Sequence, residues 1–369
     1  MSVVLTSIIY CSISIMICIS TILSIHLNRR YLRNICYALT LIIPSVISGI
    51  RYKVGTDYEL YEQGFKSIAD NTSIRQYVDF EIGYIWINKI VYFLGGNFSI
   101  LTFIMSLLTI CFVYKALLNE KDYINVGLSM FIYMFMYYLT SFNLIRQSLA
   151  IAIGLYALTC LKEKRKRKFI FFVIIASMLH KSALIILGVL IIKYIFENRK
   201  ARSIQLILFI ILIIIVLNRE LIGKIVYIIY RNSYYAGYFT RYAETDASII
   251  GYWIKNLPII VICFLSKKSI YANKKYTLYF NLMICGYIFG MLGCFTDTQV
   301  QRIAYYFTYL SIFVLSFSYK NMDNIYKKRV LRMLIVIIVL FTWWYNYFYK
   351  NFGEVVPFIT IFDQKFNKY

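Results

Sequence analysis

Acidic residues and proline are scarce in this sequence of 369 residues, which has 17 aspartates and glutamates together and only 3 prolines. Charged residues of both signs make up 15% of the chain, hydrophobic residues make up 60%, and the mean hydropathy is +0.66. So little charge cannot cover the surface of a soluble protein of this length, and the composition therefore excludes one. Because proline is the main helix breaker, we also expect helices that are seldom interrupted.

Sequence motifs for common cofactors are also missing. No glycine-rich phosphate loop and no HExxH, GxSxG or CxxC pattern occurs in the chain. The eight cysteines all lie within or at the ends of apolar runs, where we expect small packing residues and no disulfide framework. The sequence therefore predicts no metal and no cofactor, and nothing in it suggests a nucleotide or redox enzyme.

Long apolar runs recur along the whole chain, and with their flanks most approach the ~20 residues that cross a bilayer. They predict an all-α, polytopic integral membrane protein with about 12 transmembrane helices and both termini outside. The expected spans lie near residues 3–25, 35–50, 98–118, 123–141, 143–160, 169–180, 182–196, 204–218, 250–265, 276–295, 303–318 and 333–350. The short pair 169–180 and 182–196 has an alternative, one long tilted or broken helix.

Two features complete this organisation. The first apolar run, from Ser2 to Ile25, is followed by Arg29 and Arg30, so we expect a retained anchor and not a removable signal. The stretch 81–95 is too short and too interrupted to span, so it predicts an interfacial or re-entrant helix. Without visible linkers or repeats, residues 1–369 are expected to form a single membrane domain, with outer loops 51–82 and 219–249 contributing to the site.

The net charge of +23 is distributed unevenly. Most basic residues cluster between apolar runs, in segments 29–33, 115–121, 162–168, 193–202, 267–275 and 320–332. The positive-inside rule places these segments in the cytoplasm. The short Lys- and Arg-rich run at 162–168 fits a topological determinant that attracts anionic lipid, and no nucleic-acid partner is expected.

The polar residues at the predicted outer ends of the spans come from distant parts of the chain. They are Arg51, Asp57, Glu81, Arg146, Gln147, His180, Arg241, Asp297 and Arg302. An ionisable residue at membrane depth is energetically costly, so these positions are candidates for a functional site. Guanidinium groups present paired donors that match phosphate oxygens and keep their charge, so several arginines around one cavity would suit a pyrophosphate.

Several of these residues also have a structural interpretation. Thr56 and Glu59 have the spacing of a capping box, so Asp57 would only favour the positive end of a helix over 58–68. Alternatively, Asp57 next to a bilayer exit is a general base for a sugar hydroxyl. His180 is either the cap of a helix end or a base, and Asp297 a turn or cap residue.

The arginines have their own alternative. Arg241 and Arg302 could each reach to lipid headgroups and take no part in a site. Arg146 fits that interpretation less well, because the polar Gln147 and Ser148 follow it within a predicted helix. Both interpretations stay open for Arg241 and Arg302 at this point.

The candidate residues fall in blocks whose order and spacing cover nearly the full chain. The blocks are Arg51-Tyr-x-Val-Gly-Thr-Asp57-Tyr-x-x-Tyr61, Phe80-Glu81-x-Gly83-Tyr84-x-x-x-Asn88, Asn143-x-x-Arg146-Gln147-x-Leu-Ala150, His180-Lys-Ser182-Ala183, Arg302-x-x-x-Tyr306-Phe307 and Val356-Pro357-Phe358. This pattern resembles the EpsG family of bacterial exopolysaccharide proteins, whose members are regarded as Wzy-type polymerases of O-antigen, capsule or exopolysaccharide. One departure is Ile82, where the second block often has proline.

The resemblance implies a membrane glycosyltransferase, with a fold resembling the GT-C class, in the bacterial cytoplasmic membrane. A glycan on undecaprenyl pyrophosphate would be transferred at the outer face to the terminal sugar hydroxyl of another lipid-linked repeat unit. On this basis Arg146 and Arg302 would bind pyrophosphate with help from Arg51, while Asp57 or His180 would be the base. Gln147, Arg241 and Glu81 complete the expected substrate-binding set.

The expected partners follow from the same pathway. They are undecaprenyl-pyrophosphate-linked oligosaccharides, membrane lipid, a chain-length regulator and a flippase. Rival functions are a lipid-linked oligosaccharide flippase or other transporter, an O-antigen ligase and a glycan acyltransferase. Transporters tend to show inverted repeats with charges on both sides of the midplane, whereas here the polar groups collect at one predicted face, which favours an enzyme.

Overall fold

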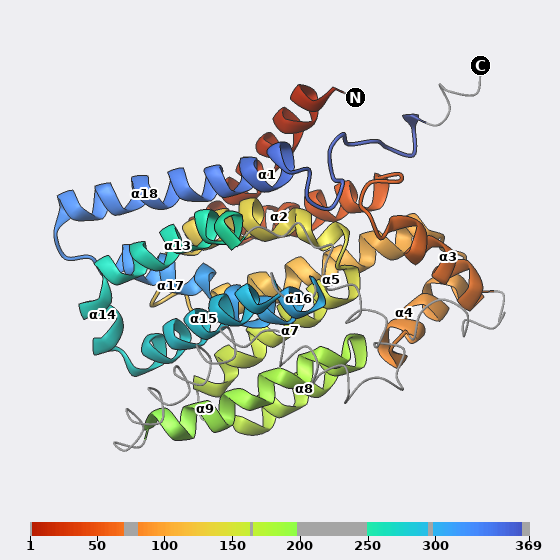
Figure 1. Cartoon of the computed structure of the whole chain (residues 1–369). Helices are drawn as coiled ribbons and strands as arrows, with labels where there is room; N and C mark the ends of the chain where they lie inside the picture. The colour runs from red at the N-terminus through yellow and green to blue at the C-terminus, as the bar shows by residue number, and fades with distance from the viewer. Residues whose placement is uncertain (1, 70–79, 163–164, 198–248, 294–297, 364–369) are drawn as a thin grey trace. The chain divides into compact units, whose positions relative to one another are not determined.

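The computed structural model describes residues 2–69, 80–162, 165–197, 249–293 and 298–363, and every regular element within these ranges is a helix (Figure 1). The extended chain contributes an isolated β-bridge between Arg51 and Thr360. The predicted all-α class is confirmed. The number of spans and the resemblance to a GT-C fold stay predictions.

The helices follow the apolar runs of the sequence. They are α1 (Val3–His26), α2 (Arg30–Ile50), α3 (Tyr58–Ala69), α4 (Ile82–Phe93), α5 (Phe98–Asn119), α6 (Val126–Tyr133), α7 (Ile145–Lys162), α8 (Lys166–Leu179), α9 (Gly188–Glu197), α13 (Ile249–Leu265), α14 (Lys267–Ala272), α15 (Lys274–Leu292), α16 (Thr298–Thr308), α17 (Ser311–Lys320) and α18 (Ile325–Trp344). Within the described ranges, α1, α2, α5 and α18 with its π-helical extension to Tyr349 are long and apolar enough to cross a membrane. The expected span 204–218 and outer loop 219–249 lie outside the described residues.

The burial pattern of α1 is the reverse of that of a soluble helix. Its buried positions include the small polar residues Thr6, Ser14, Ser20, Thr21 and Ser24, whereas large apolar residues along it are exposed. Ser20 Oγ and Thr40 Oγ1 lie 2.9 Å apart in a hydrogen bond to α2. Small and polar residues at helix contacts with apolar residues facing outward are typical of helices packed within lipid. The chain is therefore a membrane protein.

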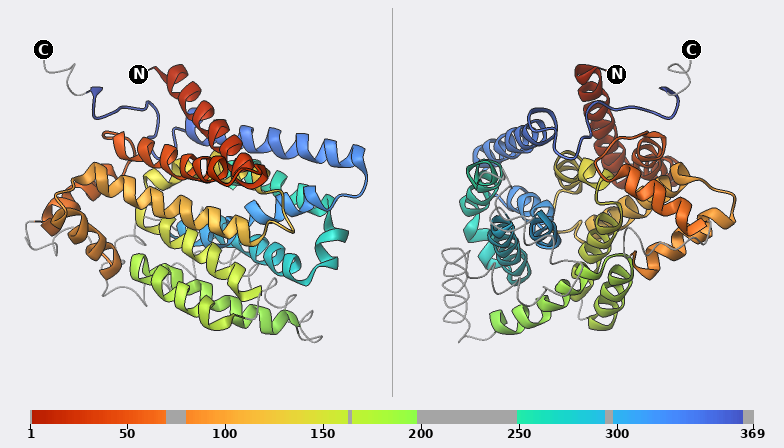
Figure 2. Two further views of the ribbon diagram at one scale, coloured as in Figure 1. Left: turned by 180° about the vertical axis from the view of Figure 1, so that it is seen from behind. Right: turned by 45° about the vertical axis from the view of Figure 1, so that its right-hand side comes forward.

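The described chain forms two compact units, Met1–Leu184 with Leu315–Tyr369 and Ile185–Val314. In the first unit α1 packs on α2, α2 on α5, α5 on α7 and α7 on α8, while α3 and α4 contact each other (Figure 1). Figure 2 shows the neighbouring α1, α2 and α5 from behind, in red to orange. In the second unit α15 packs against α16 and α13. Whether the whole chain acts as one membrane domain stays a prediction.

Some predicted spans depart from a regular α-helix although they contain no proline. After α6 the chain forms a π-helical turn, Met134–Tyr138, and a 3-10 turn, Leu139–Phe142, before α7 begins at Ile145. The predicted span 303–318 is divided between α16 and α17. The division of 303–318 goes against the expectation of seldom-broken helices, whereas the boundary near residue 142 agrees with the one predicted between the spans 123–141 and 143–160. At that boundary, the Phe142 carbonyl accepts a hydrogen bond from Arg51 in place of an intrahelical amide.

The two helices expected outside the main spans are present. The helix predicted over 58–68 is α3, and the one predicted within 81–95 is α4. The capping box predicted before α3 does not form. Thr56 N–H donates to the Gly353 carbonyl, and the Glu59 carboxylate pairs with Lys53 at 2.7 Å. Both groups of the box have partners elsewhere, which the local spacing could not indicate.

Candidate functional site

Arg51 follows directly after α2, and only 1% of the residue is exposed. Its Nη1 donates to the carbonyls of Phe142 at 2.6 Å and Val54 at 3.3 Å. Its Nε and Nη2 have no hydrogen-bond partner, and no ion pair among the described residues includes it. Burial lowers the pKa of Arg51 to about 10, so the group still carries its charge at neutral pH. Arg51 is therefore a buried cation with two donor nitrogens that have no hydrogen-bond partner.

Aromatic rings line the guanidinium of Arg51. Its Cζ lies 4.6 Å from the ring centre of Phe142 and 5.7 Å from that of Tyr58. Cation–π contacts of this kind partly offset the loss of hydration, but they leave the donors in the guanidinium plane available. An anion that reached these donors would supply the charge partner that the arginine lacks.

Asn143 connects three segments around Arg51. Its Oδ1 accepts a hydrogen bond from Thr56 Oγ1 at 3.0 Å and one from Asp57 N–H at 3.5 Å, and its Nδ2 donates to the Gly353 carbonyl at 3.0 Å. Gly55 has a φ of 108°, and a Cβ there would lie only 2.8 Å from Asn143 Oδ1. The helix break, the loop after α2 and the C-terminal segment therefore meet at one amide side chain.

The C-terminal segment 351–361 closes this part of the unit. Tyr10 on α1 donates its hydroxyl hydrogen to the Val355 carbonyl at 2.8 Å, and Phe358 N–H donates to Thr6 Oγ1 at 3.0 Å. Backbone hydrogen bonds of 2.8 Å join Tyr52 N–H to the Ile359 carbonyl and Ile361 N–H to the Ile50 carbonyl. The Val356-Pro357-Phe358 block thus lies between α1 and the residues next to Arg51.

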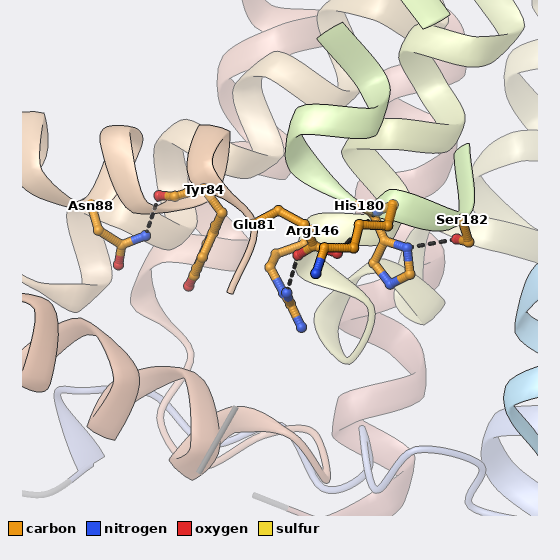
Figure 3. A network of polar contacts seen from close by, with 7 residues as sticks. Glu81, Tyr84, Asn88, Arg146, His180 and Ser182 are labelled. Atoms are coloured by element: carbon orange, nitrogen blue, oxygen red, sulfur yellow. Dashed lines mark hydrogen bonds and ion pairs between the residues drawn. The ribbon is translucent and has the colours of Figure 1, made fainter. Parts of the chain in front are cut away.

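Arg146, in the first turn of α7, forms an ion pair with Glu81, the residue before α4 (Figure 3). The pair is largely buried, with side-chain exposures of 12% for Arg146 and 8% for Glu81. The Arg146 Cζ lies 4.8 Å from the ring centre of Phe80, and its Nε has no hydrogen-bond partner. Two predicted substrate-binding residues therefore meet, and Glu81 neutralises Arg146.

The turn after α8 belongs to the same group of contacts. Lys181 N–H donates to Glu81 Oε1 at 3.0 Å, and His180 Nδ1 lies 2.6 Å from Ser182 Oγ in a hydrogen bond (Figure 3). Glu81 therefore joins α7 to the turn that carries His180. His180 ends α8, and its N–H bonds back to Ala176, so it does occupy a helix end as one interpretation expected.

Two tyrosines contribute a wall that the sequence did not assign to the site. The Arg146 Cζ lies 5.7 Å from the ring centres of both Tyr61 and Tyr84. Tyr84 is fully buried, and burial leaves its hydroxyl without a hydrogen-bond partner. Tyr61, Tyr84 and Asn143 all belong to the sequence blocks that carry the family resemblance, which was the available signal. In a chain so rich in aromatic residues, the residue type alone did not distinguish these three positions from others.

The remaining predicted site residues are placed as follows. Asp57 lies at the start of α3, half-buried, and its carboxylate accepts a hydrogen bond from Thr56 Oγ1 at 3.2 Å. Gln147 is buried beside Arg146 on α7. Arg302 lies on α16 in the other compact unit, so its participation stays a prediction. Arg241 lies outside the described residues.

The donor groups favour anion chemistry. Within the described ranges, no cluster of three or more His, Cys, Asp or Glu side chains has the arrangement to hold a metal ion. The expectation that no metal or cofactor is used stays a prediction. What the first unit does contain is two buried guanidinium groups with open donors, aromatic walls, and carboxylate and imidazole groups on neighbouring turns. Guanidinium donors are suited to phosphate oxygens, and carboxylate or imidazole groups are suited to accept a proton.

These features define the class: a helical membrane protein with a buried centre of arginines, a carboxylate and aromatic rings. The model of the EpsG family matches residues 34–360, nearly the whole sequence, and the chain belongs to the EpsG family. No curated protein and no solved structure matches it. Membership of this family supports, in broad terms, a role in making polysaccharide polymers.

The departure at Ile82 has a structural explanation. Ile82 is the first residue of α4, and its side chain is exposed. The first helical position tolerates proline well because its N–H is not needed within the helix. Isoleucine and proline are therefore interchangeable there without a change at the neighbouring Glu81.

Proposed function

We propose that this protein is a polysaccharide polymerase that joins undecaprenyl-pyrophosphate-linked repeat units at the outer face of the bacterial cytoplasmic membrane. The observation that carries the proposal is the buried guanidinium of Arg51, whose Nε and Nη2 have no hydrogen-bond partner. The family membership of the chain gives this observation its chemical context. A buried cation of this kind is costly to keep unless a ligand completes it. A lipid-linked pyrophosphate is the anion that this family's chemistry would supply.

In the proposed reaction, a hydroxyl oxygen of the acceptor sugar attacks the anomeric carbon of the donor glycan. The new C–O bond forms as the bond between that carbon and the pyrophosphate oxygen breaks, and the electron pair leaves with the lipid pyrophosphate. Arg51 and Arg146 stabilise the charge on this leaving group, with Arg302 and Arg241 as further candidates. The hydroxyl proton goes to Asp57 or His180, the two candidate bases.

The remaining partners are part of the same proposal. The donor and acceptor are both lipid-linked oligosaccharides, so they reach the site from the membrane. A flippase must supply repeat units at the outer face, and a chain-length regulator would set how many are joined. Neither a nucleotide sugar nor a nucleic acid takes part, because the pyrophosphate link already stores the free energy for transfer.

The test is a gel of lipid-linked glycans from cells with the wild-type gene, without it, and with Arg51→Lys or Arg146→Lys at matched protein abundance. Lysine keeps the charge but loses the planar fork, so we expect at least a ~10-fold loss of long polymer. Lys66→Ala is the control, since it removes only an exposed ion pair to Glu62.

The outcomes separate the functions clearly. A ladder that collapses to a single repeat unit, in the deletion and in both lysine variants, supports a polymerase with these arginines in its site. If the deletion leaves no repeat unit at the outer face, the protein is a transporter and the proposal is wrong. If the deletion collapses the ladder but the lysine variants make near-normal polymer, the assignment of the arginines is wrong.

A further inference from the structure

The two buried arginines of the first unit differ in their partners. Arg51 has no acidic partner, whereas Arg146 is paired with the Glu81 carboxylate. A carboxylate and a phosphate use the same donors of a guanidinium group, so the two compete for Arg146. If Arg146 binds the pyrophosphate of the donor, Glu81 must first move away from it.

We propose that Glu81 is a displaceable placeholder for phosphate on Arg146. Its carboxylate occupies the anion position while the site is empty and is displaced by the pyrophosphate of the donor lipid. After transfer, it returns to help expel the lipid pyrophosphate that is left. This inference rests on the proposed function, because it takes a pyrophosphate as the ligand.

The surroundings of Glu81 suit a short movement. Its Oε1 accepts the Lys181 N–H at 3.0 Å, and this bond does not involve Arg146. When Oε2 leaves the guanidinium, the carboxylate therefore keeps a partner and stays next to the site. Its return is an intramolecular step with a high effective concentration, so it competes well even with a dissolved or lipid-borne anion.

Arg146 has aromatic neighbours besides the Glu81 carboxylate. The ring centres of Phe80, Tyr61 and Tyr84 lie 4.8 to 5.7 Å from its Cζ, and these rings come from the turn before α4, from α3 and from α4 itself. The guanidinium therefore keeps these ring contacts if only the carboxylate group of Glu81 moves. Its Nε has no partner even in the ion pair, which leaves a donor for the incoming ligand to approach first.

A reaction that repeats many times requires that the lipid pyrophosphate leave after each transfer, and the Glu81 placeholder would meet this requirement. A buried arginine without any counterion would hold the lipid pyrophosphate so tightly that its release would limit each cycle. An internal carboxylate lowers the net affinity, because part of the binding free energy is used to break the ion pair. Removing the carboxylate charge should therefore tighten binding while it slows turnover, whereas damage to a structural ion pair would slow turnover without tightening binding.

The experiment measures binding of farnesyl pyrophosphate, a short soluble polyprenyl pyrophosphate, to the purified full-length protein in lipid nanodiscs. Glu81→Gln keeps the shape of the side chain but removes its charge and replaces one of the two acceptor oxygens, which bind Arg146 and the Lys181 N–H, with an NH2 donor. We expect this variant to bind the probe ~10-fold more tightly than the wild type and to make polymer more slowly in cells. Glu81→Asp keeps the charge on a shorter side chain, and we expect a smaller tightening.

The matched control is Glu59→Gln, which removes an exposed ion pair to Lys53 on the neighbouring loop and should leave binding unchanged. Weaker or unchanged probe binding by Glu81→Gln would overturn the placeholder and leave only a structural ion pair. If Glu81→Gln does not fold, the comparison of Glu81→Asp with the wild type decides in the same way. Failure of the wild type itself to bind the probe would instead count against the proposed function.

Discussion

Asn143 offers a sharp test of how the Arg51 region is held together. The variant Asn143→Ala removes the acceptor for Thr56 Oγ1 and Asp57 N–H and the donor to the Gly353 carbonyl. At about 1 kcal/mol for each of the two 3.0 Å bonds, and less for the 3.5 Å bond, the local contact loses about 2 kcal/mol. Because every 1.4 kcal/mol is tenfold, opening of the loop from the C-terminal segment should become ~30-fold more frequent.

Two backbone amides report this opening directly. Gly55 N–H donates to the Glu354 carbonyl and Thr56 N–H to the Gly353 carbonyl, each at 3.1 Å. Hydrogen–deuterium exchange of a peptide covering these two amides should accelerate by about that factor, while amides in the middle of α5 should not change. Unchanged exchange at Gly55 and Thr56 would refute the view that Asn143 holds the segments together. We also expect reduced polymer, since the loop positions Arg51.

Two further predictions concern other parts of the first unit. Asp57→Asn should abolish elongation of the polymer, because an amide cannot accept the proton, and it should not reduce the amount of protein inserted in the membrane. If the variant makes normal polymer on the glycan gel, Asp57 is only a helix-end residue. Ser20→Ala removes the 2.9 Å hydrogen bond between α1 and Thr40 of α2. We expect it to lower the free energy of unfolding, measured with denaturant in detergent, by about 0.6 kcal/mol. An unchanged free energy of unfolding would show that this hydrogen bond does not stabilise the protein.

The helices were predictable because each rests on a local property of the chain. The apolar runs at 3–25, 35–50 and 98–118 correspond closely to α1, α2 and α5, since a bilayer requires a length and a composition that a short window reveals. The amphipathic α3 was predictable from similarly local signals. The hydrogen bond from Arg51 to the Phe142 carbonyl at the end of the segment after α6 was not, because its donor lies far away in the sequence.

The candidate site was predictable only in part, for the same reason. The chemistry of Arg51, Arg146 and Glu81 pointed to a shared anion site, but nothing local distinguishes an arginine with open donors from one with a carboxylate partner. Glu81 lies 65 residues from Arg146 along the chain, and the packing of α4 against α8, which itself packs against α7, brings them together. The prediction of a capping box was wrong for the same reason. The Thr56 N–H binds the Gly353 carbonyl and the Glu59 carboxylate binds Lys53, and neither partner could be recognised from the spacing.

The contacts of the C-terminal segment set an order of events during synthesis. Arg51 leaves the ribosome well before the residues that pair with its neighbours, because the Ile359 carbonyl that pairs with Tyr52, and the Gly353 and Glu354 carbonyls that hold the loop, are made much later. Until then the first helices are inserted without the segment that closes the region around Arg51. A chain that stops before Gly353 lacks these backbone acceptors, so we expect the loop after α2 to be held less firmly in it.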